Sequence, residues 1–228
     1  WAPEKLPPLK ADLEAPFRIA IDFANSVELA AKIPRALKGL RTNTPGIWKP
    51  LNAKGIFFGK GTAPKAAFLF TGQGSQYINM LRELRKTEPI VADTFAEADK
   101  VMEPLIGRPL SEFIFIDDED PEAIAKANRR LMQTEITQPA VLTVDIALYR
   151  MMKAYGMYPD YVMGHSLGEY GALVASRALT FVEALKAVSA RGNEMAKVQV
   201  EDKGLMVAVF SSPDKIQEVI DQIDGYVE

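Results

Sequence analysis

The chain has 228 residues, of which 48% are hydrophobic and 25% charged, and its formal net charge is −3 at pH 7. This composition is that of a globular protein, and the charge gives no electrostatic reason to expect nucleic acid or a membrane as a partner. Because the chain has no cysteine and a single histidine, disulfides, zinc–thiolate sites, cysteine nucleophiles and histidine-rich metal sites are excluded.

No apolar run reaches the roughly 18 residues that a membrane-spanning helix needs, and no signal-peptide pattern begins the sequence. We therefore expect a cytoplasmic protein. The first residue is Trp1, which suggests a segment of a longer chain.

The first 64 residues are expected to form a small αβ segment that leads into the main domain. Two short apolar runs predict strands, at Phe17–Ile21 and Gly55–Phe58. Asn25 and Glu28 have the spacing of a capping box, which predicts a helix towards Leu40. Pro34 is expected to kink that helix or to end it early. Three stretches rich in proline or glycine are expected to be linker or loop: 1–15, 41–53 and 59–64.

The rest of the chain alternates predicted strands with predicted helices, which indicates a mainly parallel α/β sheet. Short apolar runs predict buried strands at Ala66–Phe70 and Tyr161–Met163. A further strand is expected at Leu205–Phe210, and Tyr226-Val227 could open another. Apolar periodicity predicts helices at 76–86, 88–105, 121–132, 138–155, 181–198 and 213–223. Pro139 is expected in the first turn of its helix, and Thr180 with Glu183 forms a capping box before another.

The pattern most informative about function is Gly164-His165-Ser166-Leu167-Gly168. It reads G-x-S-x-G, in which a sharp strand-to-helix turn exposes a serine nucleophile. A predicted strand precedes the pattern and a helix is expected to leave Ser166 directly, so that the free N–H groups of the first helical turn would point at the hydroxyl. The N–H of Leu167 is then well placed to help stabilise an oxyanion. The pattern alone also fits a glycine-rich turn with an incidental serine.

A serine of this kind normally needs a histidine base that is separate in sequence. His165 is the only histidine of the chain. Because it is the neighbour of the serine on a tight turn, its ring should point away from the hydroxyl. We therefore expect His165 to support the turn and not to act as the base.

Two further features could complete an acyl site. In Thr71-Gly72-Gln73-Gly74-Ser75-Gln76, glycines after a buried strand let the backbone approach a ligand, and the loop could donate a second N–H to the oxyanion. A plain β-to-α turn is equally compatible, and the pattern of a phosphate-binding loop is absent. Arg191 could bind a carboxylate, or it could be a surface arginine paired with a glutamate, which the residues alone favour.

Together these features resemble the malonyl-CoA:acyl-carrier-protein transacylases and the acyltransferase domains of fatty acid and polyketide synthases. Four motifs in register carry the resemblance: Phe68 to Gln76, Thr137-Gln138-Pro139-Ala140, Gly164 to Tyr170, and Arg191-Gly192-x-x-Met195. The resemblance covers about 66–228 and departs from the family pattern at Thr71, where the family usually has proline. Residues 1–64 are similar to the linker between a ketosynthase and its acyltransferase.

The resemblance implies an α/β-hydrolase-like large subdomain with a parallel sheet and a ferredoxin-like small subdomain. The chain would then comprise a ketosynthase–acyltransferase-type linker at 1–64, an incomplete large subdomain at 65–203 and the beginning of the small subdomain at 204–228. It also implies a catalytic histidine in a motif downstream of Glu228, so that the remaining C-terminal part of the acyltransferase would be a partner of this chain.

The resemblance further implies roles for individual residues. Ser166 would be the nucleophile, and Arg191 would bind the free carboxylate of a malonyl-type group. The backbone N–H groups that would form the oxyanion hole belong to Gln73 and Leu167. The rest of the pocket would be lined by Gln138 and Met195.

The implied reaction moves a malonyl or related carboxyacyl group from CoA to the phosphopantetheine thiol of an acyl carrier protein, through an acyl-Ser166 intermediate. Leu167 directly after the serine favours malonyl over methylmalonyl. The implied partners are the carrier protein and neighbouring synthase domains such as a ketosynthase, with no permanently bound cofactor and no metal. An α/β-type serine hydrolase or thioesterase shares the G-x-S-x-G turn, and a non-catalytic scaffold fragment of a megasynthase fits the missing histidine, so both stay open.

Overall fold

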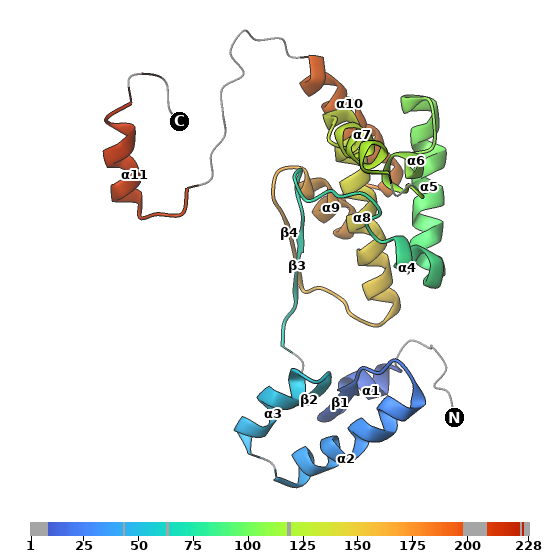
Figure 1. Cartoon of the computed structure of the whole chain (residues 1–228), viewed down its shortest axis with the longest axis vertical. Helices are drawn as coiled ribbons and strands as arrows, with labels where there is room; N and C mark the ends of the chain where they lie inside the picture. The colour runs from blue at the N-terminus through green and yellow to red at the C-terminus, as the bar shows by residue number, and fades with distance from the viewer. Residues whose placement is uncertain are drawn as a thin grey trace. The chain divides into compact units, whose positions relative to one another are not determined.

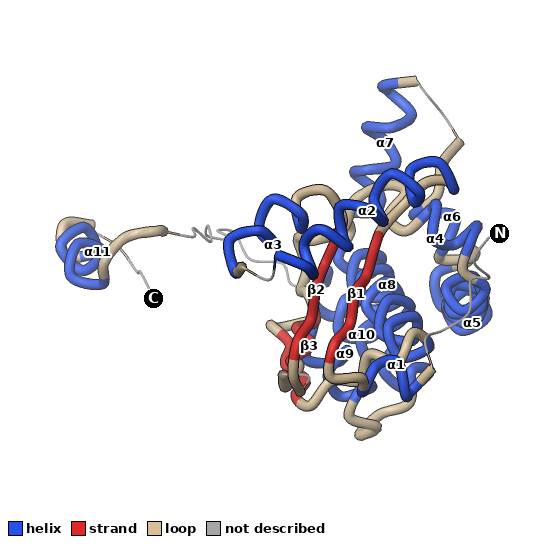
Figure 2. The backbone as a smooth tube through the Cα atoms, turned by 90° about the horizontal axis from the view of Figure 1, so that it is seen from below, coloured by secondary structure: helices blue, strands red, loops and turns tan. Residues whose placement is uncertain are grey.

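Short helices and two antiparallel strands make up the N-terminal segment. The computed structural model describes residues 9–42, 44–62, 64–117, 120–197, 209–223 and 225. In this segment the elements follow one another as α1 (Lys10–Glu14), β1 (Phe17–Ile21), α2 (Ser26–Thr42), α3 (Pro45–Asn52) and β2 (Ile56–Lys60) (Figure 1). The two strands pair with Phe17 opposite Lys60 and lie side by side in Figure 2. The segment has a small buried core of its own, formed by Ala36, Leu51 and Ile56.

α2 passes through Pro34, where the sequence predicts a kink or an early end, so that expectation is wrong. The helix is anchored on both sides of the proline. Before it, the ammonium of Lys32 lies 2.8 Å from the Glu28 carboxylate and 2.5 Å from that of Asp22. After it, Gly39 packs closely against side chains of α3. These contacts outweigh the local cost of a proline inside a helix.

α3 lies within 41–53, which the sequence predicts to be loop, so that expectation is also wrong. Pro45 opens the helix at a position where the missing N–H of proline leaves no hydrogen bond unmade. Trp48 of α3 stacks on Phe58 of β2, with the ring centroids 4.5 Å apart. Proline therefore marks a helix start here, and the aromatic contact ties that helix to the strand.

The main domain places a parallel strand pair against a layer of helices. β3 (Ala67–Phe70) and β4 (Tyr161–Gly164) run parallel, with Phe70 opposite Gly164. α9 (Gly168–Ala175) packs on both strands and on α8 (Thr134–Ala154), which also packs on α5 (Pro89–Ile106). The remaining helices are α4 (Arg82–Thr87), α6 (Ser111–Ile114), α7 (Pro121–Leu131) and α10 (Phe181–Lys197). Their side chains bury a large core that includes Phe95, Met102, Leu142 and Leu185.

Most predicted elements of the main domain are confirmed. The strands expected at 66–70 and 161–163 are β3 and β4, and the helices expected at 88–105, 121–132 and 181–198 are α5, α7 and α10. The capping box before α10 is formed, because the backbone N–H of Thr180 donates to the Glu183 carboxylate (2.8 Å) and that of Glu183 donates to the Thr180 hydroxyl (3.2 Å). The mixed α/β class is therefore confirmed, and within the described residues the parallel sheet consists of the β3–β4 pair.

Two helices begin elsewhere than expected. α4 begins later, because Asn79 and Leu81 have left-handed φ angles of 63° and 60°, a conformation that a helix does not contain. α8 begins earlier, at Thr134, so that Pro139 lies in its interior and not in its first turn. The residues just before this proline are buried, and their packing outweighs the preference of proline for a helix start. No pattern in the sequence predicts the short helix α6.

The chain divides into two units, Trp1–Ala196 and Lys197–Glu228. In the second unit, α11 (Pro213–Ile220) is the helix expected from residue 213. The strand expected at Leu205–Phe210 falls mostly outside the described residues, and the one at Tyr226-Val227 falls outside them entirely. Over the residues that the structure describes, no helix is long and apolar enough to cross a membrane.

Candidate active site

Ser166 stands on a sharp turn between β4 and α9. Its φ angle is 53°, in the left-handed region that residues other than glycine rarely adopt. The turn is closed by two backbone hydrogen bonds: the N–H of Gly168 donates to the carbonyl of His165 (3.0 Å), and that of Glu169 donates to the carbonyl of Ser166 (3.1 Å). The serine is exposed. This is the strand–turn–helix geometry of a nucleophile elbow, as the sequence predicts.

Two glycines allow this turn because the strand and helix backbones approach too closely for side chains. A Cβ on Gly164 would collide with the backbone of Gly168. A Cβ on Gly168 would collide with the carbonyl groups of Phe70 and Thr71 at the end of β3. The G-x-S-x-G spacing therefore has a steric cause, and it brings the loop after β3 next to the elbow.

Arg191 of α10 reaches the serine. Its Nη2 lies 3.5 Å from Ser166 Oγ. Gly192, the next residue, packs against the first turn of α8: a Cβ there would lie 2.8 Å from the Cα of Glu135. This close packing holds α10 in place beside the site. Within the described ranges, no ion pair joins Arg191 to a carboxylate.

Gln138 and Met195 are brought together from α8 and α10. Gln138 is fully buried, and its Nε2 lies 3.3 Å from the Met195 sulfur. Its Oε1 has no hydrogen-bond partner among the described residues. Met195 lies one helical turn after Arg191 on the same face of α10 and is 47% exposed. The Met195 thioether therefore lies on the face of α10 that carries Arg191, and the Gln138 amide of α8 contacts it.

The loop after β3 places backbone N–H groups near the elbow. A Cβ on Gly72 would lie 2.9 Å from the carbonyl oxygen of His165, so the two loops touch. The side-chain amide of Gln73 donates to the Thr134 hydroxyl (3.5 Å). Over the described chain, the N–H groups of Gln73 and Leu167 donate to no protein acceptor. Both remain available to an oxyanion.

The structure reveals one ionisable group near the site that the sequence did not indicate. The Thr71 hydroxyl lies 3.0 Å from Asp145 Oδ1, and Asp145 is only 8% exposed on α8. Burial raises the pKa of this carboxyl to about 7, although the hydrogen bonds from Thr71 act in the opposite direction. The other carboxyl oxygen, Oδ2, has no partner among the described residues. The only sequence signal was an acid within an otherwise apolar stretch of helix.

His165 is exposed and lies beside Gly72, with its Nδ1 3.4 Å from the position of a Cβ on that glycine. Within the part of the chain that the structure describes, no hydrogen bond joins His165 to the Ser166 hydroxyl. The geometry gives no support for His165 as the base of this serine.

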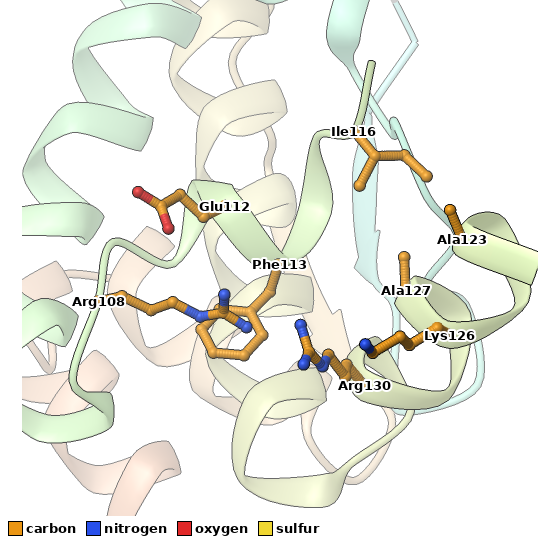
Figure 3. A pocket seen from close by; sticks show the side chains of 8 residues that line it. All are labelled: Arg108, Glu112, Phe113, Ile116, Ala123, Lys126, Ala127 and Arg130. Carbon is orange, nitrogen blue, oxygen red and sulfur yellow. The ribbon is translucent and has the colours of Figure 1, made fainter. Parts of the chain in front are cut away.

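A pocket of about 210 Å³ lies between α6 and α7, away from these residues (Figure 3). The guanidinium of Arg108 lies over the ring of Phe113, 3.9 Å from its centroid, and Lys126 and Arg130 also line the pocket. None of the residues predicted for acyl chemistry lines it. In the described ranges no cluster of histidine and carboxylate side chains could hold a metal ion.

Comparison with known proteins identifies the family. The family model described as the acyl transferase domain matches residues 67–227. The malonyl CoA-acyl carrier protein transacylase of Bacillus subtilis (strain 168) is 39% identical over 160 residues, which are 70% of this chain and 46% of that protein. A phenolphthiocerol synthesis polyketide synthase type I of Mycobacterium marinum is 33% identical over 192 residues, 84% of this chain and 8% of that protein.

Solved structures agree with this result. The acyltransferase domain from the second module of the salinomycin polyketide synthase has a TM-score of 0.62 at 31% identity and matches 83% of this chain and 39% of that one. The transacylase of Clostridium perfringens has a TM-score of 0.57 at 32% identity and matches 70% of this chain and 46% of that one. The chain therefore belongs to the acyl transferase domain family. It spans less than half the length of the curated transacylases it matches.

Proposed function

We propose that this chain carries the nucleophile and the oxyanion hole of a malonyl-CoA:acyl-carrier-protein acyltransferase. Ser166 Oγ attacks the thioester carbonyl of malonyl-CoA and the CoA thiol leaves, which gives a malonyl ester on the serine. The phosphopantetheine thiol of a carrier protein then attacks this ester, takes the malonyl group and returns the proton to the serine. The observation that carries the proposal is the 3.5 Å contact between Arg191 and Ser166 on the elbow, because a malonyl group needs a cation for its free carboxylate beside the nucleophile.

The oxyanion of each tetrahedral intermediate would be bound by the backbone N–H groups of Gln73 and Leu167. Both groups have no acceptor within the described chain, and their loops touch through Gly72 and His165. Leu167 also stands at the N-terminus of α9, where the helix dipole favours negative charge. Two donors from separate loops are the usual arrangement of such a hole.

The malonyl carboxylate would be bound by the Arg191 guanidinium, which can donate two parallel hydrogen bonds to it. Gln138 and Met195 would line the same pocket, with the unpartnered Gln138 Oε1 as an acceptor. Leu167 after the serine favours malonyl over methylmalonyl. The donor in the first half-reaction is malonyl-CoA, and no permanently bound cofactor is needed.

The general base is proposed to be a histidine outside these 228 residues. His165 is the only histidine of the chain, and no hydrogen bond among the described residues joins it to Ser166. Without a base the serine hydroxyl is a weak nucleophile, so we expect the chain alone to be inactive or slow.

The organisation proposed for the chain has three parts. Residues 1–64 are a linker of the ketosynthase–acyltransferase type, 65–203 belong to an α/β-hydrolase-like large subdomain, and 204–228 begin a ferredoxin-like small subdomain. The partners would be an acyl carrier protein and, in a synthase, a neighbouring ketosynthase. The similarity to a polyketide synthase over 84% of the chain supports the synthase setting.

The test uses the full-length protein with malonyl-CoA and a holo acyl carrier protein. We expect a malonyl adduct on Ser166 by peptide mass spectrometry, transfer of that group to the carrier protein, and neither in Ser166→Ala. Release of free malonate without transfer would indicate a serine hydrolase instead. No adduct on Ser166 under any condition would contradict the proposal and leave the scaffold alternative.

A further inference from the structure

We propose that Asp145 is a positioning residue for acyl transfer, which acts as a neutral carboxylic acid through Thr71 and Ser75 on the loop that carries the Gln73 N–H. The inference rests on the proposed function of that loop as one half of the oxyanion hole. Among the described residues, Asp145 forms no hydrogen bond with the nucleophile or with Arg191, and its hydrogen-bond partner is Thr71. Its effect on the reaction would therefore pass through the loop.

The contacts form a continuous chain from the helix to the turn. Asp145 Oδ1 lies 3.0 Å from Thr71 Oγ1. Thr71 Oγ1 lies 3.0 Å from Ser75 Oγ. Ser75 Oγ in turn lies 2.8 Å from the carbonyl oxygen of Gly72. One buried side chain of α8 is thus connected to both ends of the tight turn that encloses Gln73.

The protons available decide the charge of Asp145. Each of the three oxygen–oxygen contacts needs one proton, and the hydroxyls of Thr71 and Ser75 supply two. The carbonyl of Gly72 can only accept. All three contacts become hydrogen bonds if the carboxyl donates to Thr71, Thr71 to Ser75, and Ser75 to Gly72. With an ionised Asp145, Thr71 donates to the carboxylate and Ser75 must share its single proton between Thr71 and the Gly72 carbonyl, which weakens both bonds.

The surroundings of the carboxyl favour the same neutral state. Asp145 is 8% exposed, and its Oδ2 has no partner among the described residues. An unpartnered buried oxygen costs much more when it carries a charge than when it belongs to a neutral acid. Burial accordingly raises the pKa of Asp145 to about 7.

No charged neighbour accounts for this shift. The causes are burial, which raises the pKa, and the Thr71 hydrogen bonds, which lower it. β3 carries no ionisable side chain. The helices α5, α6, α7, α9 and α10 pack on α8. None of their ionisable groups contributes: Asp93, Glu97, Asp99, Lys100, Glu103, Glu112, Glu122, Lys126, Arg129, Arg130, Glu169, Tyr170, Glu183, Lys186, Arg191, Glu194 and Lys197.

The turn sets the direction of the catalytic N–H. The carbonyl of Gly72 also accepts from the backbone N–H of Ser75 (3.4 Å), so Gln73 and Gly74 occupy the two central positions. Gly74 has a φ angle of 109°, as the third residue of a type II turn requires. The side-chain bond from Ser75 reinforces this turn. If Asp145 ionises, the reinforcement weakens and the Gln73 N–H loses its fixed orientation.

The test compares Asp145→Asn, Thr71→Val and the parent in the full-length protein. The rate of malonyl-Ser166 formation is measured from pH 5.5 to 9, together with the amide hydrogen-exchange protection of residues 71–76. In the parent we expect rate and protection to fall above about pH 7. The asparagine amide donates to Thr71 at every pH, so Asp145→Asn should keep the rate and the loop protection high above pH 7. Thr71→Val removes the hydroxyl that links Asp145 to Ser75, so it should lower the rate of malonyl-Ser166 formation roughly tenfold at all pH values.

Asp99→Asn is the matched control. The Asp99 carboxylate accepts from the N–H and the hydroxyl of Ser111, both at 2.7 Å, but it has no link to the loop. It should leave the pH profile unchanged. Two results together would overturn the inference. In Asp145→Asn the rate of malonyl-Ser166 formation would still fall above pH 7 as in the parent, and in the parent the hydrogen-exchange protection of residues 71–76 would not depend on pH. If the parent forms no adduct, the proposed function fails, while the pH dependence of loop protection still decides the role of Asp145.

Discussion

Ser166 combines the proposed nucleophile with a strained backbone, since its φ angle is 53°. A residue with a Cβ loses about 1 kcal/mol in this region, which glycine adopts freely. We therefore expect Ser166→Gly to be up to about 1 kcal/mol more stable than Ser166→Ala, while neither forms an acyl adduct. Urea denaturation measures the stability difference. A glycine variant less stable than the alanine variant would mean that the turn stores no strain.

Arg191 is expected to discriminate between acyl groups. Replacing Arg191 by alanine removes a charge-assisted bond to the malonyl carboxylate, worth about 2 kcal/mol, and should lower kcat/KM for malonyl-CoA about 30-fold relative to acetyl-CoA. Competition between the two thioesters gives this ratio directly. Arg129→Ala, on α7 at the surface, serves as the control. An equal loss for both acyl groups would contradict a carboxylate-binding role.

At this scale the sequence indicates Ser166 and the loop glycines but misses Asp145. A motif of five residues is local, and its steric reason lies within one turn. The partner of Asp145 is Thr71, 74 positions earlier in the chain, so no spacing rule connects the two. A single acid in a helix is expected at the surface unless its partner, here Thr71 on the loop after β3, is known.

The contact between β3, β4 and α9 is the element-scale basis of the site. Gly168→Ala would drive a Cβ into the carbonyl groups of Phe70 and Thr71, and we expect it to cost about 3 kcal/mol or more in the free energy of unfolding. Gly46→Ala in α3 is the matched control, because nothing lies within 4 Å of a Cβ there. It should change stability by less than about 0.5 kcal/mol. Similar losses in the free energy of unfolding for the two variants would show that Gly168 does not pack tightly against the end of β3.

The elements themselves were predictable where their signals are local. Apolar runs ended by glycine or proline gave the strands, and the capping box of Thr180 and Glu183 gave the start of α10. Errors gathered at proline. Pro34 and Pro139 lie inside helices, where tertiary packing decides the outcome and the local preference of proline does not.

For the whole molecule, Asp145 makes stability depend on pH. Its pKa is about 7 in the folded protein against 3.8 for an ordinary aspartate, so the folded state keeps a proton that the unfolded chain has lost. The free energy of unfolding should therefore fall as the pH rises from about 4 to about 7, by about 2–4 kcal/mol from this group. Asp145→Asn should remove that slope. Urea titrations at several pH values measure it, and an unchanged slope in the variant would assign the effect elsewhere.

The carboxyls of Glu28 and Glu183 act in the opposite sense. Hydrogen bonds to Lys32 and Thr180, respectively, hold their pKa values below the ordinary range. Their stabilising effect is present near neutral pH and is lost only as the solution becomes acidic. Among the described carboxyls with a shifted pKa, the fall in stability between about pH 5 and pH 7 therefore comes from Asp145.

The separate buried clusters have a consequence for cooperativity. The cluster of Ala36, Leu51 and Ile56 shares no residue with the large core of the main domain. Two such cores can melt as independent foldons, the smaller at the lower temperature. Calorimetry at pH 5 and pH 8 should then show two transitions, of which only the larger moves with pH. The pH dependence of each transition would then identify whether the N-terminal segment or the main domain is unfolding. A single transition would mean that the two cores unfold as one cooperative unit.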